Sequence, residues 1–167
     1  MTHGVDWVVD LLGRAESVDE VELALRSSAR PAVDADGATV VRRESDQCYY
    51  AQEDAMSPLW QGQRFPLTEC ISGWAMLHRQ IVAIPDIRVD ARIPQEAYRP
   101  TFVRSLVMVP IGTTGSAVGA IGAYWADEHV ATDDEVSALQ VLAEAAAAAL
   151  ARIRSAPGPD PDKLVPA

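Results

Sequence analysis

Apolar positions recur along this chain with two different periods, and the order of these periods predicts its helices and strands. Apolar residues follow helical spacing over 5–14 and 18–30, and again over 132–154 near the end of the chain. Stretches rich in β-branched and aromatic residues predict strands, which lie at 38–44, 47–53, 81–84, 105–111 and 117–126.

The starts and ends of the predicted helices carry local signals. Ser17 with Glu20, and Thr132 with Glu135, have the spacing of a capping box, in which the two side chains cap the backbone N–H groups of a helix start. The second predicted helix ends before Pro31, because proline has no N–H to donate.

Strands joined by tight turns predict an antiparallel sheet, and the helices at the two chain ends can cover one face of it. Residues 54–68 and 85–104 have no clear period and carry prolines, with short helices expected at 72–79 and 95–98. This middle part then covers the other face. The pattern predicts an α+β sandwich with a cavity under the irregular segment.

Composition narrows the classes of function. At 167 residues the chain is long enough for one domain with a substantial core. Its formal net charge of −10 argues against a nucleic-acid partner and against an anionic membrane surface. We find no apolar run long enough for a transmembrane helix and no signal-type start, and we expect a cytoplasmic protein. The scattered histidines lack the spacing of a zinc or haem site, so we predict no metal.

The order of four segments resembles that of a GAF domain, and most closely of GAF domains in bacterial sensor histidine kinases. The segments are "FPLTECISGWAMLHRQIVAIPDI", "YRPTFVRSLVMVPI", "VGAIGAYWA" and "TDDEVSALQVLAEAAAAAL". The resemblance covers about residues 15–154. It implies a central antiparallel sheet of about six strands, a small-molecule pocket on one face under short helices and loops, and terminal helices on the other face that pair between protomers.

We therefore divide the chain into an N-terminal helix over 1–16, a GAF domain over 17–154 and a disordered tail over 155–167. Nothing that resembles a kinase, cyclase or DNA-binding output domain follows Ser155. We expect either a stand-alone GAF protein or a piece whose output module lies elsewhere.

The resemblance implies a sensory or regulatory domain of bacterial signal transduction that is not itself a catalyst and holds no cofactor. We expect it to bind a small molecule, to form a homodimer through its N- and C-terminal helices, or to do both. A kinase or another signalling protein is the expected further partner.

Residues of the irregular middle and the neighbouring strands are candidates to line the pocket, because ligand pockets are mostly apolar with a few polar groups. The candidates are Trp60, Phe65, Cys70, Trp74, Ile84, Tyr98, Phe102 and Met108. Ordinary core packing is the alternative for the aromatic residues, and a cavity filled by them would mark a GAF domain used only for dimerisation. Tyr124 and Trp125 are adjacent on a strand, so only one of them can face the cavity.

Cys70 raises the question of thiol chemistry. It precedes a predicted short helix, a setting that can lower a thiol pKa, but His78 lies too far along that helix to act as its base. Pocket or core lining is the simpler role. A bilin attachment site commonly has Cys followed by His, and here Ile71 follows. The alternative function is a stand-alone GAF enzyme similar to methionine sulfoxide reductases, which would have to use Cys48 and Cys70 together.

Several arginines in 79–104 are interleaved with acidic residues. They could hold an anionic ligand, but solvated ion pairs are the simpler account. They are Arg79, Arg88, Arg92, Arg99 and Arg104.

Overall fold

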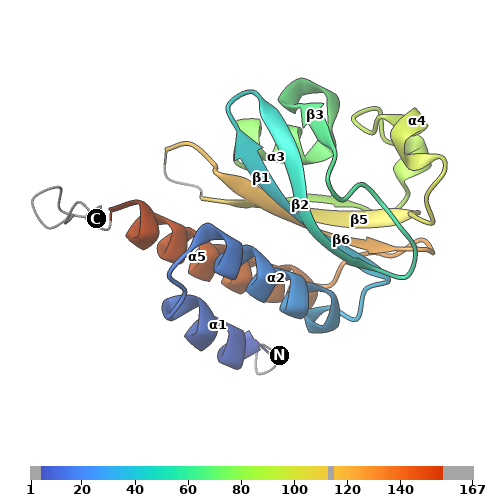
Figure 1. Cartoon of the computed structure of the whole chain (residues 1–167). Helices are drawn as coiled ribbons and strands as arrows, with labels where there is room; N and C mark the ends of the chain where they lie inside the picture. The colour runs from blue at the N-terminus through green and yellow to red at the C-terminus, as the bar shows by residue number, and fades with distance from the viewer. Residues whose placement is uncertain (1–4, 113–114, 156–167) are drawn as a thin grey trace, which may run out of the picture.

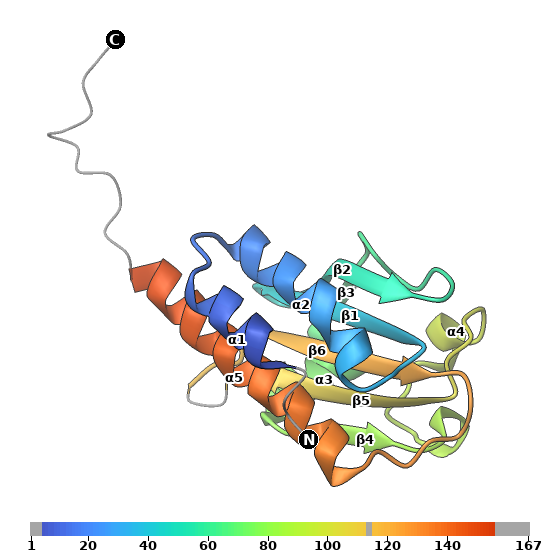
Figure 2. The ribbon, with the colours of Figure 1, turned by 90° about the horizontal axis from the view of Figure 1, so that it is seen from below.

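A single antiparallel sheet forms the centre of the molecule. The computed structural model describes residues 5–112 and 115–155. Six strands pair in the order β3-β2-β1-β6-β5-β4, and Figures 1 and 2 show the sheet that they form. Their bounds are β1 Gly37–Glu44, β2 Gln47–Ala55, β3 Arg64–Pro66, β4 Val82–Ile84, β5 Ser105–Ile111 and β6 Gly119–Trp125. The expected α+β fold with about six strands is confirmed.

Helices cover both faces of this sheet. The long helices α2 and α5 lie on one face, where α5 packs against α2 and β5, and α1 packs on the outer side of these two helices (Figures 1 and 2). The short helices α3 and α4 and two 3-10 turns cover the other face (Figure 1). The bounds are α1 Asp6–Gly13, α2 Val18–Ala32, η2 Leu67–Glu69, α3 Ile71–His78, η3 Ile87–Val89, α4 Gln95–Tyr98 and α5 Asp133–Ser155.

Alternation along the strands divides the interior into two cores. Val107 and Val109 on β5 face the long helices, whereas Leu106 and Met108 face the short ones. The adjacent aromatic residues on β6 divide in the same way. Trp125 belongs to the core under the long helices and Tyr124 to the core under the short ones, so the expectation that only one of them faces the predicted pocket side holds.

The predicted capping box at Thr132 is complete, whereas the one at Ser17 is present in part, because the Glu20 carboxylate accepts from the Glu16 N–H at 2.6 Å instead of from the cap residue. The Ser17 hydroxyl accepts from the Glu20 N–H at 3.2 Å. The N–H of Glu135 donates to the Thr132 hydroxyl at 3.1 Å, while the Thr132 N–H donates to the Glu135 carboxylate at 2.8 Å. These bonds fix where α2 and α5 begin, and therefore how both helices meet the sheet.

Two details differ from the sequence predictions. Helix α2 does not end before Pro31 but includes it and runs to Ala32. In the last turn a proline removes only one helical hydrogen bond, and the Ala35 N–H closes the end by donating to the Arg30 carbonyl at 3.1 Å. The segment 54–68, predicted as irregular, contains the short edge strand β3, which is too brief to show a period.

Among the described residues, α5 is the one helix long and apolar enough, by length and composition, to cross a membrane. A core helix of a globular domain passes the same test. Here Leu139, Leu142 and Ala146 are fully buried against the sheet and α1, whereas Ala148 and Ala151 of the same helix are exposed. The predicted tail beyond Ser155 lies outside the described residues.

Candidate functional site

An aromatic cluster fills the face of the sheet under the short helices. We use this name for Tyr50, Trp60, Phe65, Tyr98 and Tyr124. Trp60 is its centre, with ring centroids 4.7 Å from Tyr98, 5.5 Å from Tyr50 and 5.6 Å from Tyr124. Phe65 meets Tyr50 edge-on at 5.6 Å. These separations are those of favourable aromatic pairs, so the cluster is a packed unit.

A carboxylate holds the loop that carries Trp60. Glu53 on β2 accepts hydrogen bonds from the backbone N–H groups of Leu59, Trp60 and Gln61, each at 2.9 Å. Trp60 also donates its indole N–H to the Ala97 carbonyl of α4 at 3.1 Å. Trp60 therefore connects the sheet, its own loop and α4, and it sets the height of α4 above the cluster.

The two tyrosines that flank Trp60 differ in their polar partners. The Tyr124 hydroxyl lies 2.8 Å from the Thr39 hydroxyl, so it is satisfied by the neighbouring strand β1. The Tyr98 hydroxyl is fully buried and has no hydrogen-bond partner within residues 5–112 and 115–155. Burial raises the pKa of Tyr98 well above its usual value, so the group stays a neutral hydroxyl. A buried hydroxyl without a partner is costly, and its position calls for a polar group.

The structure brings most of the predicted site residues together. Five of the eight predicted residues are buried in the core that contains the aromatic cluster: Trp60, Cys70, Ile84, Tyr98 and Met108. The other three, Phe65, Trp74 and Phe102, are partly buried and pack against it. Trp74 lies further out, stacked on His78 with ring centroids 4.0 Å apart and with Arg92 over its ring. Phe102 is also only partly buried and covers Gly37 at the other end of the cluster. That these residues bind a ligand stays a prediction.

The two cysteines meet at the edge of this core. Their sulfur atoms lie 2.9 Å apart. Cys48 is on β2, where it pairs with Phe65 of β3, and the chain then turns through η2 so that Cys70 comes back beneath Cys48. Cys48 is completely buried, and Cys70 is 8% exposed.

Polar groups around Cys70 favour its thiolate. The Ser72 hydroxyl donates to the Cys70 sulfur at 3.4 Å and also lies 3.0 Å from the Tyr50 hydroxyl. Together with the Cys48 thiol, the largest influence, and the Gly73 N–H, it lowers the pKa of Cys70 to about 7 against the opposing effect of burial. Hydrogen bonding to Cys70 and burial raise the pKa of Cys48. In the neutral pair the Cys70 thiol is placed to donate, to the Cys48 sulfur at 2.9 Å and to the Pro66 carbonyl at 3.5 Å. Once Cys70 has lost its proton, the Cys48 thiol can donate to it across the same contact.

Of three further site residues, Tyr50, Ser72 and Cys48, sequence reasoning missed the first two and considered Cys48 only as the partner thiol of Cys70 in the alternative enzyme function. The parity of the strand could have found two of them, because Cys48 and Tyr50 are two residues apart and so point to the same face of β2. Ser72 has no such signal. Its role depends on where the turn after β3 places the start of α3.

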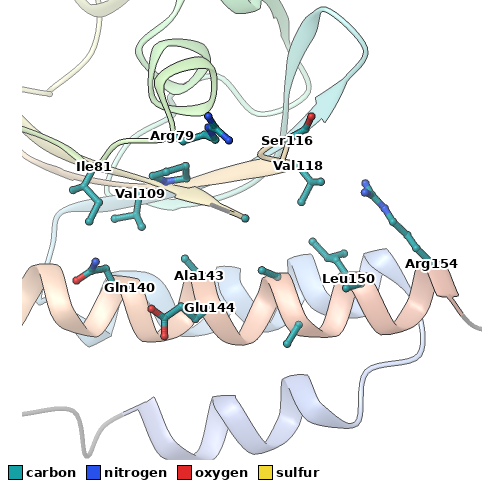
Figure 3. Close-up of a pocket in the computed structure, with 15 residues that line it drawn as sticks. Arg79, Ile81, Val109, Ser116, Val118, Gln140, Ala143, Glu144, Leu150 and Arg154 are labelled. Carbon is teal, nitrogen blue, oxygen red and sulfur yellow. The ribbon is translucent and has the colours of Figure 1, made fainter. Parts of the chain in front are cut away.

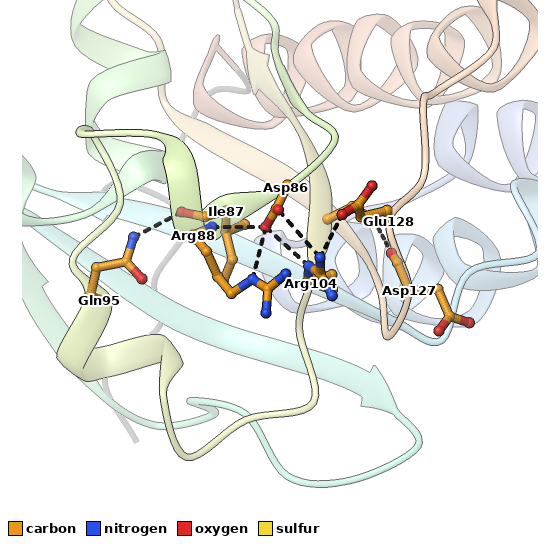
Figure 4. A network of polar contacts seen from close by, with 8 residues as sticks. Asp86, Ile87, Arg88, Gln95, Arg104, Asp127 and Glu128 are labelled. Carbon is orange, nitrogen blue, oxygen red and sulfur yellow. Dashed lines mark hydrogen bonds and ion pairs between the residues drawn. The ribbon is translucent and has the colours of Figure 1, made fainter.

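Ion pairs fix the segment that covers the cluster, residues 85–104. The Asp86 carboxylate accepts from the Arg104 side chain at 3.0 and 3.3 Å and from the Arg88 N–H at 3.0 Å (Figure 4). Arg104 also pairs with Glu128, and the Gln95 amide donates to the Ile87 carbonyl at 2.8 Å (Figure 4). The expectation of ion pairs is confirmed for Arg88, Arg92 and Arg104, which are engaged with Asp86 and Asp90.

Of the eight predicted site residues, Trp60 and Phe65 line hollows beside the short helix α4. Two hollows flank α4, with volumes of about 460 and 280 Å³, and Phe65, Glu96 and Ala97 line both. The interior below them is filled by the aromatic cluster itself. A sequence cannot predict how completely side chains fill a cavity, because this depends on their rotamers.

A larger cavity lies elsewhere, on the side of the long helices, and none of the predicted site residues lines it. This groove of about 640 Å³ runs between α5 and the β5–β6 end of the sheet. Figure 3 shows Ile81, Val109 and Val118 on the sheet side, with Glu144 and Leu150 on α5. Its lining is mainly small and apolar. It suits a packed helix better than a polar metabolite.

Within residues 5–112 and 115–155, no group of three or more His, Cys, Asp or Glu side chains is placed to hold a metal ion.

Comparisons with known proteins agree with this architecture. The GAF domain of a phosphoenolpyruvate-protein phosphotransferase from Acinetobacter superposes with a TM-score of 0.77 at 13% identity, covering 91% of this chain and 93% of that one. Free methionine-R-sulfoxide reductase from Neisseria meningitidis gives 0.77 at 16% identity, covering 92% and 89%. A domain of a two-component sensor histidine kinase protein from Sinorhizobium meliloti gives 0.64 at 15% identity, covering 84% and 95%.

These identities are low, so each likeness shows the fold alone. No protein with a curated function matches the chain. The sequence pattern of the GAF domain matches residues 15–151, which is most of the chain and includes both the aromatic cluster and the cysteine pair. The chain therefore belongs to the GAF domain family.

Proposed function

We propose that this GAF domain is a sensory or regulatory domain of bacterial signal transduction, and that it binds a small molecule against the Tyr98 hydroxyl. The observation that carries the proposal is this buried hydroxyl without a partner among the described residues, at the centre of a core built from the predicted site residues. A ligand with an apolar body and one polar group would pack on the aromatic rings and satisfy the hydroxyl.

Entry would require α4 to move. This helix is short, both hollows flank it, and the Trp60 indole N–H reaches it through a single hydrogen bond to Ala97. The ligand would replace that contact and hold the covering segment in a second position. Ligand occupancy would then shift the balance between two arrangements, as a sensor requires.

A thermal-shift screen tests the binding proposal. Nucleotides, amino acids and small carboxylic acids are added to the wild-type chain and to Tyr98→Phe. A ligand at 100 times its Kd stabilises by about 2.7 kcal/mol, which raises the Tm of a domain of this size by roughly 5–10 °C. We expect the shift in wild type to be at least halved in Tyr98→Phe. Equal shifts in both chains would contradict the assignment of Tyr98.

We also propose a homodimer through the terminal helices, with a kinase or another signalling protein as the downstream partner. Trp7 and Leu11 are exposed on one side of α1, four residues apart. The exposed side of α5 carries Ala148 and Ala151, whose small side chains let another helix approach closely. The groove beside α5 and these apolar residues together offer a surface for the same helices of a second copy.

A thiol enzyme is the second candidate function, favoured by the sulfur contact between Cys48 and Cys70. In this reading the Cys70 thiolate attacks the sulfoxide sulfur of a methionine sulfoxide, the oxygen passes to Cys70 with uptake of a proton, and methionine leaves, so that Cys70 becomes a sulfenic acid. The Cys48 thiol then attacks the Cys70 sulfur, water leaves, and the disulfide is reopened by an external dithiol reductant. Turnover with dithiothreitol and free methionine sulfoxide, lost in Cys70→Ser, would support this candidate. Absence of turnover in the wild-type chain would rule out this candidate, and the regulatory function would remain.

A further inference from the structure

The further inference concerns the reversible oxidation of the two cysteines. We propose that Cys48 and Cys70 form a reversible intramolecular disulfide when the chain meets hydrogen peroxide, and that Cys70 is the thiol that reacts first. This inference does not depend on a bound small molecule, since it concerns only the two sulfur atoms and the groups around them.

The distance between the two sulfurs is the main support. They lie 2.9 Å apart, and a disulfide bond is about 2.0 Å long, so bond formation needs a small approach of two side chains. The two residues are 22 positions apart in sequence and come from different elements, β2 and the residue that begins α3. The bond would tie the start of α3 to the sheet.

The surroundings assign different roles to the two thiols. Cys70 has some exposure and faces the Ser72 hydroxyl, which stabilises a thiolate, and the Gly73 N–H does the same at the N-terminus of α3. Cys48 has no exposure and keeps its proton. Cys70 is therefore the thiol nearer to solvent, and Cys48 lies fully buried beside it as the second thiol.

The reaction balances with peroxide as the oxidant. The Cys70 thiolate attacks one peroxide oxygen, the O–O bond breaks, and hydroxide leaves, so Cys70 becomes a sulfenic acid. Cys48 then attacks the Cys70 sulfur, the S–O bond breaks, and the hydroxyl leaves as water with the Cys48 proton. In total two thiols lose two electrons and two protons, and one peroxide becomes two waters. A dithiol reductant reverses the change.

The bond would act next to the aromatic cluster. Ser72 connects the Cys70 sulfur at 3.4 Å to the Tyr50 hydroxyl at 3.0 Å, and Tyr50 contacts Trp60. Oxidation removes the thiolate that Ser72 donates to. Two hydrogen bonds, both made by Ser72, thus connect the cysteine pair to the aromatic cluster at the proposed ligand site.

Mass spectrometry of the full chain tests the proposal. The reduced chain is treated with hydrogen peroxide, the remaining thiols are blocked with N-ethylmaleimide under denaturing conditions, and the digest is mapped. We expect both thiols to disappear together, one peptide pair linked through Cys48 and Cys70, and full recovery with dithiothreitol. Oxidation of Cys70 with Cys48 still free, or a disulfide between two chains, would overturn the proposal.

Two matched variants test the assignment of roles. Cys48→Ser keeps a hydrogen-bond donor beside Cys70, so Cys70 should still react and its sulfenic acid should be trapped by dimedone. In Cys70→Ser, peroxide should oxidise Cys48 about tenfold more slowly, in line with the lost thiolate. Equal rates in the two variants would overturn the order of reaction. Faster disulfide formation with free methionine sulfoxide than with peroxide would overturn the regulatory role in favour of the enzyme.

Discussion

Two buried tyrosines of the aromatic cluster differ in whether their hydroxyl groups are hydrogen-bonded. Tyr124 is hydrogen-bonded to Thr39, whereas Tyr98 has no partner among the described residues. Both rings contact Trp60, so the apolar surroundings of the two residues are similar. The difference between them is therefore a difference in the satisfaction of one polar atom.

Replacement by phenylalanine should separate the two residues. Tyr124→Phe leaves the buried Thr39 hydroxyl without its partner and should lower the free energy of unfolding by about 1–2 kcal/mol. Tyr98→Phe removes a hydroxyl that has no bond to lose, so the ligand-free chain should be unchanged or slightly more stable. Urea unfolding followed by circular dichroism measures both. Similar losses of stability in the two variants would contradict the account of Tyr98.

Gly73 shows a different kind of residue-scale constraint. A Cβ atom at this position would collide with the backbone carbonyl of Leu67, so α3 can pack against η2 only with glycine here. The same close approach places the Gly73 N–H near the Cys70 sulfur, where it helps to lower the thiol pKa. The sequence "CISGW" thus couples helix packing to the state of the cysteine.

The covering segment 85–104 is the central feature at the scale of elements. It has little regular structure, and Asp86 anchors it through Arg104 and Arg88 (Figure 4). Arg104 first, with Arg88 after it, lowers the pKa of Asp86 to about 2, well below its usual range. Because the folded pKa is the lower one, Asp86 stabilises the fold above about pH 4, and this contribution is lost as the pH falls toward 2.

This linkage predicts a pH-dependent effect of Asp86→Asn. The variant should have a lower Tm than wild type at pH 7, and the gap should narrow between about pH 4 and pH 2, where Asp86 of the wild type becomes protonated. Melting curves across this range measure the gap. Asp10→Asn, at an exposed ion pair with Arg14, is the matched control and should shift Tm by no more than about 1 °C. A gap that stays constant down to pH 2 would contradict the role of Asp86.

The helices and strands that have a regular spacing of apolar residues could be predicted from the sequence, whereas the candidate site could be predicted only in part. The helices and long strands follow from spacing, and parity placed Tyr124 and Trp125 on opposite faces. The contact between Cys48 and Cys70 could not be predicted, because it depends on β3, which has no readable period. The unpaired hydroxyl of Tyr98 could not be predicted either, since satisfaction of a polar atom depends on neighbours from several elements.

At the scale of the whole molecule, the two faces of the sheet have separate tasks in our account. The face under the short helices holds the aromatic cluster and the thiols, and the opposite face carries α1 and α5 (Figure 2). Strands β5 and β6 contribute side chains to both cores. A change in packing on one face can therefore reach the helices on the other through the same strands.

The dimer proposal makes its own prediction. Ala148 is exposed on α5 and lines the groove shown in Figure 3, so Ala148→Arg should block a second helix without disturbing the monomer. Light scattering after gel filtration should give a dimer mass for wild type and a monomer mass for Ala148→Arg at the same concentration. Val89→Arg, at an exposed position on η3, is the control and should remain dimeric. A wild-type chain that is monomeric at high concentration would contradict the proposal.

The central claim is that the core under the short helices binds a small molecule through Tyr98. Native mass spectrometry of the wild-type chain, after incubation with a small-molecule extract of bacterial cells, tests it most directly, with Tyr98→Phe measured in parallel. Our account predicts an extra mass on the native wild-type protein that is lost on denaturation and is weak or missing in Tyr98→Phe. Bare protein masses in both chains, or the same extra mass on both, would contradict it.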